Sequence, residues 1–509
     1  MNLVQSVEWA VFAPPLIAAV AAVAVLVTDL FLPAARKAVL GWLAVGGLAL
    51  AALALVPLRD GDRATFCLPG DAGLCSYSAD RFAVIVQLLV LAGAFLAALL
   101  SLPGSGERDD EGEDGEQAPP SGEFWFLLLC SASGAALLPA ARDLATLVIA
   151  LEVTTLPAYA LVGLRRAGAP VRNAGPEAAL KFFLASITAT AVGLLGISFV
   201  YAGAGSLHLA EIAEQLPAAD PGLATLAEAG VVLTLVAFAF KVAAVPFHFW
   251  VPETYLGAPL PVAAYLSVVG KTAGLAGLAL VTSGAFPGHG DLWGPALAVL
   301  AGLTMTAGNV AALRTDPEAP HSAIRLLAWS SVGQAGYLLV PLAAAAYTDE
   351  GAVGTAVAYA LMYGAVNLGA FAVAAHVARH ARAHRIADYG GLWARQPFAA
   401  LALAFFLLCL AGLPPGVIGL FAKVAVFESA VDAGLGVLAV VMALNVAIAL
   451  YYYLRWTAVL FRAEPGGASR VGMRPAAPLT GAIALTAAVG AILSGAPQII
   501  LTFASGTFL

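Results

Sequence analysis

The stretch VVLTLVAFAFKVAAVPFHFWVPE, residues 231–253, decides the class of fold. It contains an apolar run long enough to cross a bilayer, with one positive charge, Lys241, inside the run. Pro246 follows five residues later, and a proline in a transmembrane helix removes one backbone hydrogen bond and frees a carbonyl group. The stretch therefore predicts a membrane helix that is interrupted beside a buried ionisable group.

The composition extends this prediction to the whole chain. Its 509 residues are 61% hydrophobic and 11% charged, with a mean hydropathy of +0.91. Soluble domains carry about 25% charged residues, so this chain cannot build a water-facing surface. Because lipid cannot satisfy loose backbone groups, we expect an all-α polytopic membrane protein with about 14 transmembrane helices. The predicted spans are 9–32, 38–57, 80–102, 123–140, 144–164, 178–202, 226–247, 258–281, 292–313, 323–345, 353–378, 398–430, 434–460 and 476–503.

Positive charge is distributed unevenly over the predicted loops. With the N-terminus outside, the outside loops hold Arg59, Arg63, Arg81 and Arg142, whereas the cytoplasmic connections and span ends hold most of the other arginines. The positive-inside rule then predicts a multi-pass protein with both termini outside. In this orientation the loop with Cys67 and Cys75 faces the oxidising side, where a disulfide can form.

Four lysines lie inside apolar spans: Lys181, Lys241, Lys271 and Lys423. An ionisable group at membrane depth costs at least ~2.5–3.5 kcal/mol on insertion scales. A buried lysine can release its proton, which an arginine cannot do. A line of buried lysines therefore indicates a path for protons or another small cation.

One carboxylate and a second helix break accompany these lysines. Glu152 lies in the span LVIALEVTTLPAYALVGL (147–164), and Lys423 lies in LAGLPPGVIGLFAKVAVFESA (410–430). A glutamate–lysine pair whose separation changes is a proton switch, because the lysine holds its proton near the carboxylate and releases it farther away. Two interrupted helices, each with a lysine near the break, are typical of the internal repeats of transporters.

Several polar residues allow two interpretations. Lys181 lies near the start of its span, where a lysine often extends to the lipid headgroups. His248 either relays protons or anchors the chain at the membrane interface. The acidic run 107–116 (ERDDEGEDGE) is expected to be a solvated loop, with a docking or ion-attracting role as the alternative. Polar residues of 326–337 (LLAWSSVGQAGY) either hydrate a passage or hold helices together; these are Ser330, Ser331, Gln334 and Tyr337.

Motifs for other chemistries are missing from the sequence. It has no Walker loop, no GxSxG elbow, no HExxH and no paired-cysteine metal spacing. We therefore expect that this chain binds no cofactor, no metal and no nucleic acid.

Separated blocks of the sequence resemble the antiporter-like membrane subunits of respiratory complex I, NADH-quinone oxidoreductase. The resemblance extends over about residues 120–462 and rests on 150–164, 179–206, 240–274, 326–339, 411–434 and 445–456. Within the family, a lysine rather than a glutamate at Lys423 favours the subunit N branch over subunit M. The chain also has no long lateral helix after its last span, which disfavours subunit L.

The resemblance implies fourteen helices, two inverted five-helix repeats, and broken helices in the seventh and twelfth positions. The implied units are 1–102 (three N-terminal helices), 103–122 (acidic cytoplasmic loop), 123–281 (first repeat), 292–460 (second repeat) and 476–503 (C-terminal helix). Glu152 and Lys241 would form the coupling pair of the first half-channel. Lys271 would link the halves through His248, and Lys423 would open the second half-channel to the outside. Lys181 matches a family lysine in the sixth helix.

The implied activity is proton translocation in the bacterial inner membrane by one subunit of a translocase. Electron transfer would take place in other subunits, which would hold NADH, FMN, iron–sulfur clusters and a quinone. The expected partners are other membrane-arm subunits, lipid and protons. A subunit of a multi-subunit Na+/H+ antiporter is the alternative, because the same Glu and Lys motifs would serve it. A scaffold that no longer pumps is disfavoured by the full set of lysines.

Overall fold

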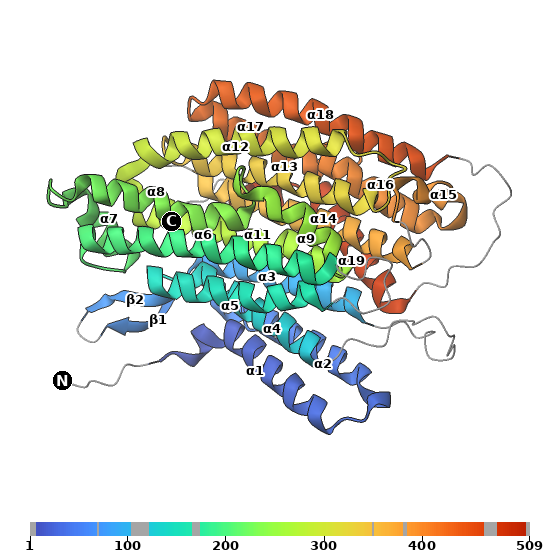
Figure 1. The fold of residues 1–509 in the computed structure, drawn as a ribbon, viewed down its shortest axis with the longest axis horizontal. Coiled ribbons are helices and arrows are strands. Elements are labelled where there is room, and N and C mark those ends of the chain that lie inside the picture. Colours follow the sequence, from blue (N-terminus) through green and yellow to red (C-terminus); the bar gives the residue numbers. More distant parts are fainter. Residues whose placement is uncertain are drawn as a thin grey trace.

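The computed structural model describes residues 7–68, 71–102, 122–164, 174–348, 351–379, 384–462 and 476–504. Its long helices run roughly along one axis and form a bundle (Figure 1). The hairpin of β1 (Arg63–Leu68) and β2 (Asp71–Ala79) lies at one end of the bundle, together with α7, and α15 lies at the opposite end. The acidic run 107–116 lies outside the described residues.

The described helices fall into two groups along the chain. The first half holds α1 (Trp9–Phe31), α2 (Ala38–Leu53), α3 (Arg81–Ser101), α4 (Gly122–Leu137), α5 (Leu144–Gly163), α6 (Ala174–Ala204), α7 (Leu209–Gln215), α8 (Ala224–Val242), α9 (Trp250–Gly257), α10 (Leu260–Tyr265) and α11 (Lys271–Ala279). The second half holds α12 (Gly290–Leu313), α13 (Ser322–Ala344), α14 (Ala352–Ala378), α15 (Leu392–Arg395), α16 (Pro397–Ala411), α17 (Val417–Asp432), α18 (Gly436–Leu460), α19 (Ala477–Gly495) and α20 (Gln498–Ala504).

Membrane crossings agree with the prediction from hydropathy. Among the described residues, 13 helical segments are long and apolar enough to cross a membrane. A crossing needs about 20 residues, and α16 and α17 have only 15 and 16. They replace the single span expected at 398–430, and they lie toward opposite ends of the bundle in Figure 1. The polytopic helical fold is thus confirmed, with the β1–β2 hairpin as an addition that hydropathy did not predict.

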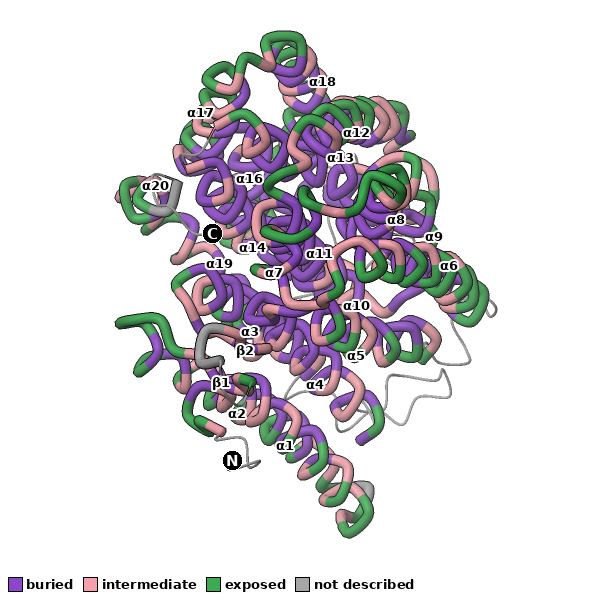
Figure 2. The backbone as a smooth tube through the Cα atoms, turned by 90° about the vertical axis from the view of Figure 1, so that its left-hand side faces the viewer, coloured by how far each residue is buried: buried purple, intermediate pink, exposed green. Residues whose placement is uncertain are grey.

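Two helices form the centre of the bundle. Most residues of α13 and α14 are buried, and the view along the bundle in Figure 2 shows them surrounded by other helices, whereas α1, α6 and α18 lie at the periphery. Glycines permit the closest approach of helices. A Cβ atom on Gly308 of α12 would lie 2.2 Å from the backbone nitrogen of Gly333 on α13.

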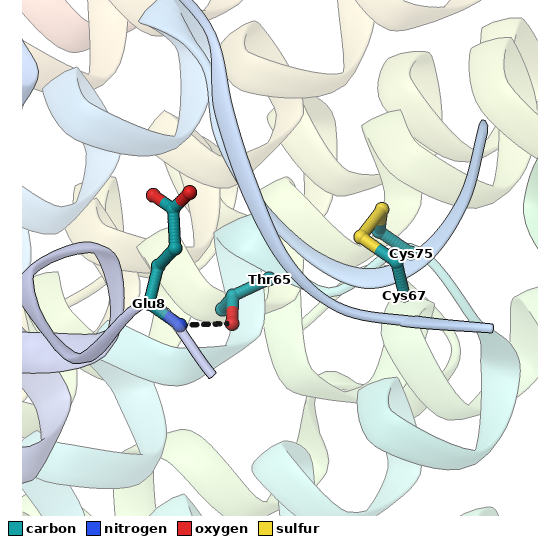
Figure 3. Close-up of a disulfide and its surroundings, with 4 residues drawn as sticks. All are labelled: Glu8, Thr65, Cys67 and Cys75. Atoms are coloured by element: carbon teal, nitrogen blue, oxygen red, sulfur yellow. Dashed lines mark hydrogen bonds between the residues drawn. A yellow bond between two sulfur atoms is a disulfide. The ribbon is translucent and has the colours of Figure 1, made fainter. Parts of the chain in front are cut away.

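The hairpin is fastened both covalently and by packing. Cys67 faces Cys75 across the two antiparallel strands, and the two form a disulfide (Figure 3). The backbone N–H of Glu8 donates to Thr65 Oγ1 at 3.0 Å, as Figure 3 also shows. The rings of Phe66 and Tyr77 pack against Phe12 of α1 at centroid distances of 5.2 and 5.3 Å. These contacts hold the loop between α2 and α3 against the start of α1.

Candidate functional site

The first helix break follows α8 directly. Ala243 takes a left-handed conformation with a φ of 67°, which ends the helix. Pro246 then brings no N–H, so the chain passes through a single turn at 247–249 before α9 begins. Thr304 Oγ1 on α12 accepts from the N–H of Val245 at 2.9 Å and so satisfies a backbone donor of the break. Lys241 therefore lies at the interrupted end of α8.

Lys241 is surrounded by aromatic rings and one hydroxyl. Its side chain is 4% exposed, and Nζ donates to Ser186 Oγ of α6 at 2.5 Å. The ring centroids of Tyr159, Phe182 and Phe240 lie 5.4–5.7 Å from Nζ. Aromatic faces attract an ammonium group, and this attraction strengthens when water is excluded. The pocket can therefore hold a charged lysine without an ion pair.

Glu152 is bonded to a residue other than Lys241. It lies half-buried on α5, where its Oε1 accepts from Thr190 Oγ1 at 2.7 Å. Both residues are described, and no ion pair within 4.0 Å joins them. The structure therefore does not bring the pair expected from the sequence into contact.

A small cavity adjoins Lys241. Its polar lining includes Ser131, Thr154, Thr155 and Tyr265 beside the lysine, and its volume is about 10 Å³. Tyr265 donates to Ser131 Oγ at 2.8 Å, and Ser131 donates to the carbonyl of Thr154 at 2.5 Å. The two threonine hydroxyls bond backbone carbonyls of α5, so the surface of the cavity itself is mainly apolar.

Lys271 connects the two halves of the bundle. It begins α11 directly after a π-helical turn at Leu266–Gly270, and its side chain is 1% exposed. Turns of this kind are frequent at functional sites. Its Nζ donates to the backbone carbonyl of Ser331 on α13. Ser331 Oγ in turn lies 2.7 Å from the hydroxyl of Tyr363 on α14.

Lys423 fills a gap in helical hydrogen bonding at the second break. Gly412, with a φ of 85°, ends α16, and Pro414 and Pro415 follow. In a continued helix, the N–H groups of residues 414 and 415 would bond the carbonyls of Leu410 and Ala411, but prolines have none. Nζ of Lys423, which is 5% exposed, donates to these two carbonyls at 2.7 and 2.9 Å.

A network of tyrosines, serines and one amide lies between Lys271 and Lys423. The hydroxyls of Ser330 and Tyr453 are 2.5 Å apart, and Tyr453 accepts from Gln334 Nε2 at 3.2 Å. Tyr359 donates to Gln334 Oε1 at 2.5 Å. The ring of Tyr337 lies 5.3 Å from Nζ of Lys423. Ser330, Ser331 and Gln334 thus bond side chains of other helices, whereas the hydroxyl of Tyr337 has no hydrogen-bond partner among the described residues.

Sequence analysis did not identify Tyr359, Tyr363 and Tyr453 as candidates. All three are buried and lie in long apolar runs, where a tyrosine resembles any other large core residue. For Tyr453, the only signal was its place in the triplet YYY at 451–453.

The two remaining candidates are Lys181 and His248. Lys181 projects from the exposed side of α6 and pairs with Glu177 at 2.7 Å, with about half of each side chain exposed. His248 lies between α8 and α9, and its ring centroid is 5.6 Å from that of Trp329 on α13. Its Nδ1 is buried and lacks a hydrogen-bond partner among the described residues. The structure thus brings Lys241, Lys271 and Lys423 into one buried zone and leaves Lys181 outside it.

Comparisons with known proteins identify the family. The family model described as NADH:quinone oxidoreductase/Mrp antiporter, TM, matches residues 141–449. The chain is 62% identical to NADH-quinone oxidoreductase subunit N 2 of Streptomyces griseus, over 99% of this chain and 94% of that protein.

Solved structures agree with this assignment. A chain of respiratory complex I from Thermus thermophilus with bound aureothin is 29% identical, with a TM-score of 0.76 over 97% of this chain and 100% of that chain. A chain of the Mrp complex from Dietzia sp. DQ12-45-1b, 22% identical, has a TM-score of 0.80 over 97% of this chain and 96% of that chain, which shows the shared fold alone. The chain therefore belongs to the NADH:quinone oxidoreductase/Mrp antiporter family of membrane subunits, within its branch of NADH-quinone oxidoreductase subunit N proteins.

Proposed function

We propose that this chain translocates protons as a membrane-arm subunit of NADH-quinone oxidoreductase, through Glu152, Lys241, Lys271 and Lys423. One observation carries the proposal: each of the three buried lysines lies at an irregularity in helical hydrogen bonding, with 5% or less of its side chain exposed. Irregular backbone is tolerated at membrane depth only where it is buried in protein or lines a water-filled cavity, and π-helical turns and broken helices are frequent at functional sites. Family membership supplies the coupling to NADH and quinone chemistry.

The first half-channel would work through the separation of Glu152 and Lys241. A nearby carboxylate favours the ammonium form of a lysine, whereas burial away from water without such a partner favours the neutral amine. Thr190 holds the carboxylate out of contact with the lysine. A shift of α5 or α6 that moves Glu152 would therefore load or release the proton on Lys241.

The second half-channel would begin at Lys271 and end at Lys423. Lys271 would take a proton that reaches the centre of the bundle, with His248 as a relay between it and the first break. Lys423 would release its proton toward the outside, because α17 runs from the second break to the end of the bundle that holds the β1–β2 hairpin. Lys181 would serve only at the entrance, since its side chain is on the outer face of α6.

The setting of the proposal is a bacterial inner membrane with both termini outside. Two inverted repeats, 123–281 and 292–460, would carry one half-channel each, and the parallel between the breaks at Ala243 and Gly412 supports this division. The redox groups would belong to other subunits. Most iron–sulfur clusters are held by four cysteine thiolates, and two of the four cysteines here form a disulfide. The described residues contain no group of three or more His, Cys, Asp or Glu positioned for a metal ion.

A multi-subunit Na+/H+ antiporter remains the second candidate, because its subunits share this family and fold. The two candidate functions differ in the reaction that drives the pH gradient. Inverted membrane vesicles that carry Lys423→Ala should lose the NADH-driven pH gradient and keep NADH oxidation by an artificial acceptor. An unchanged NADH-driven gradient, with sodium-dependent proton exchange lost instead, would contradict the proposal and favour the antiporter.

A further inference from the structure

Gln334 occupies the point where the two lysine-bearing regions meet. It lies on α13, 2% exposed, and its amide contacts three other helices. Its Oε1 accepts from Tyr359 of α14, and its Nε2 donates to Tyr453 of α18 at 3.2 Å. The same Nε2 donates to the carbonyl of Leu410 on α16 at 3.5 Å. Both N–H hydrogens of the amide are thereby used in hydrogen bonds, which fixes the orientation of the side chain.

An amide in this position cannot act as a proton relay. A primary amide neither gains nor loses a proton near neutral pH, unlike a histidine, a carboxylate or an ammonium group. The hydrogen bonds that lead from Lys423 through the Leu410 carbonyl and Gln334 to Tyr453 therefore include one group, the amide, that passes no proton. Gln334 can still respond to its neighbours, because hydrogen bonds in a buried network polarise one another.

The carbonyl of Leu410 is shared between Gln334 and Lys423. Lys423 Nζ donates to this oxygen at 2.7 Å and the amide at 3.5 Å. A carbonyl oxygen has two lone pairs, and bonds from a charged donor are about twice as strong as neutral ones. The ammonium therefore holds the carbonyl more tightly than the amide does. A neutral amine on Lys423 is a weaker donor, so the amide would move toward Leu410 and loosen its bond to Tyr453.

We infer that Gln334 is a positioning residue that couples the protonation of Lys423 to the hydrogen bonds around Lys271. The inference rests on the proposed function of the lysines. Tyr453 bonds Ser330, and the neighbouring Ser331 carries the carbonyl that binds Lys271. The coupling passes a change in hydrogen bonding, and no proton crosses the amide. The titratable groups that face this network are Lys271 on α11, Lys423 on α17, Tyr337 on α13, Tyr359 and Tyr363 on α14, and Tyr452 and Tyr453 on α18.

The test compares two identical substitutions in the intact complex. Gln334→Met keeps the length of the side chain and removes its bonds. Gln87→Met is the matched control, because Gln87 is a buried amide of α3 that also donates to one tyrosine hydroxyl and one backbone carbonyl. The readouts are the amount of assembled complex, NADH oxidation by an artificial acceptor, and proton pumping in inverted vesicles as a function of pH.

Gln334→Met should reduce pumping several-fold at the wild-type optimum and leave acceptor reduction unchanged. The pH profile of pumping should move to higher pH by about half to one unit. The Leu410 carbonyl then accepts from Lys423 alone, which favours the charged form of this lysine. Gln87→Met should leave the profile in place. A profile of Gln334→Met that coincides with the control, or a loss of pumping without a shift, would overturn the inference.

Lys423→Ala, measured in the same assays, distinguishes failure of this inference from failure of the proposed function. Full pumping in Lys423→Ala would remove the proposed function itself, whereas lost pumping there with an unshifted Gln334→Met removes only the inference. If Gln334→Met does not assemble, Tyr359→Phe removes only the hydroxyl that orients the amide. That variant should show a smaller shift in the same direction, and an unshifted profile would contradict the inference equally.

Discussion

Lys241 and Lys423 lie on opposite sides of their helix breaks. Lys241 precedes the left-handed residue Ala243 by two positions and bonds the side chain of Ser186. Lys423 follows its break and reaches back to two backbone carbonyls of α16. Lys241 is therefore bonded to one side-chain hydroxyl, whereas Lys423 also bonds the free backbone carbonyls at the end of α16.

This difference predicts unequal costs for the same substitution. Lys423→Met leaves the carbonyl of Ala411 without a donor and that of Leu410 with only the distant amide of Gln334, and a buried unsatisfied group costs about 1–3 kcal/mol. Lys241→Met leaves Ser186, whose hydroxyl can bond a carbonyl of its own helix. Thermal unfolding of the detergent-purified complex should therefore show a larger loss for Lys423→Met. Equal losses in the two variants would contradict the role of Lys423 in the helix break.

Close packing at the second break predicts that one glycine is indispensable. A Cβ atom on Gly419 would lie 1.8 Å from the carbonyl oxygen of Cys409, which is backbone and cannot rotate away. Overpacking of this kind costs about 1–3 kcal/mol or more. Gly419→Ala should lower both assembly and pumping, as measured by native gels and vesicle assays. Gly481→Ala, where the added atom meets nothing within 4 Å, is the control, and normal behaviour of both variants would refute the packing argument.

The disulfide of the hairpin predicts a stability effect without loss of pumping. The bridge closes a loop between Cys67 and Cys75 at a sequence separation of 8, a length for which chain entropy gives about 2.5 kcal/mol. Replacing both cysteines by serine should make the hairpin easier to cleave in limited proteolysis. Pumping should stay near wild type, because the hairpin contains none of the proposed lysines. A double variant that resists protease as well as wild type would contradict this stabilising role.

The sequence predicted most of the fold and part of the site, for physical reasons. Apolar length identifies a span because lipid requires it, and Pro246, Pro414 and Pro415 mark breaks because they lack an N–H. The rotation of a helix is harder to predict, because its lipid-facing and core-facing sides are equally apolar. For this reason the sequence could not distinguish Lys181, which is exposed, from the buried lysines.

The remaining features depend on tertiary contacts. The bond between Tyr453 and Gln334 joins residues 119 positions apart, and no local pattern encodes it. The hairpin was not predicted, because it lies in the connection between α2 and α3. Phe66 and Tyr77 join a core there because they pack against Phe12. The Glu152–Lys241 relationship was predicted as a pair, and the geometry adds Thr190 as the partner of the carboxylate.

The buried Tyr77 of the hairpin predicts that stability depends on pH. Burial raises the pKa of the Tyr77 phenol, although its hydrogen bond with Gln87 opposes the shift. Because the folded-state pKa exceeds the unfolded value of about 10, this contribution to stability is complete below that pH and is lost as the pH rises above it. Thermal unfolding followed across the alkaline range should therefore show a smaller alkaline loss for Tyr77→Phe than for wild type. Identical curves would contradict this assignment.

The most direct test of the lysine path is NADH-driven acidification of inverted membrane vesicles that carry Lys241→Ala. Lys37→Ala is the matched control, because Lys37 lies at the start of α2 and pairs with Asp29 away from the buried line. The account predicts that Lys241→Ala abolishes the pH gradient and retains NADH oxidation by an artificial acceptor, while Lys37→Ala keeps both. A full gradient in Lys241→Ala, at normal complex content, would contradict the central claim that protons pass through this lysine.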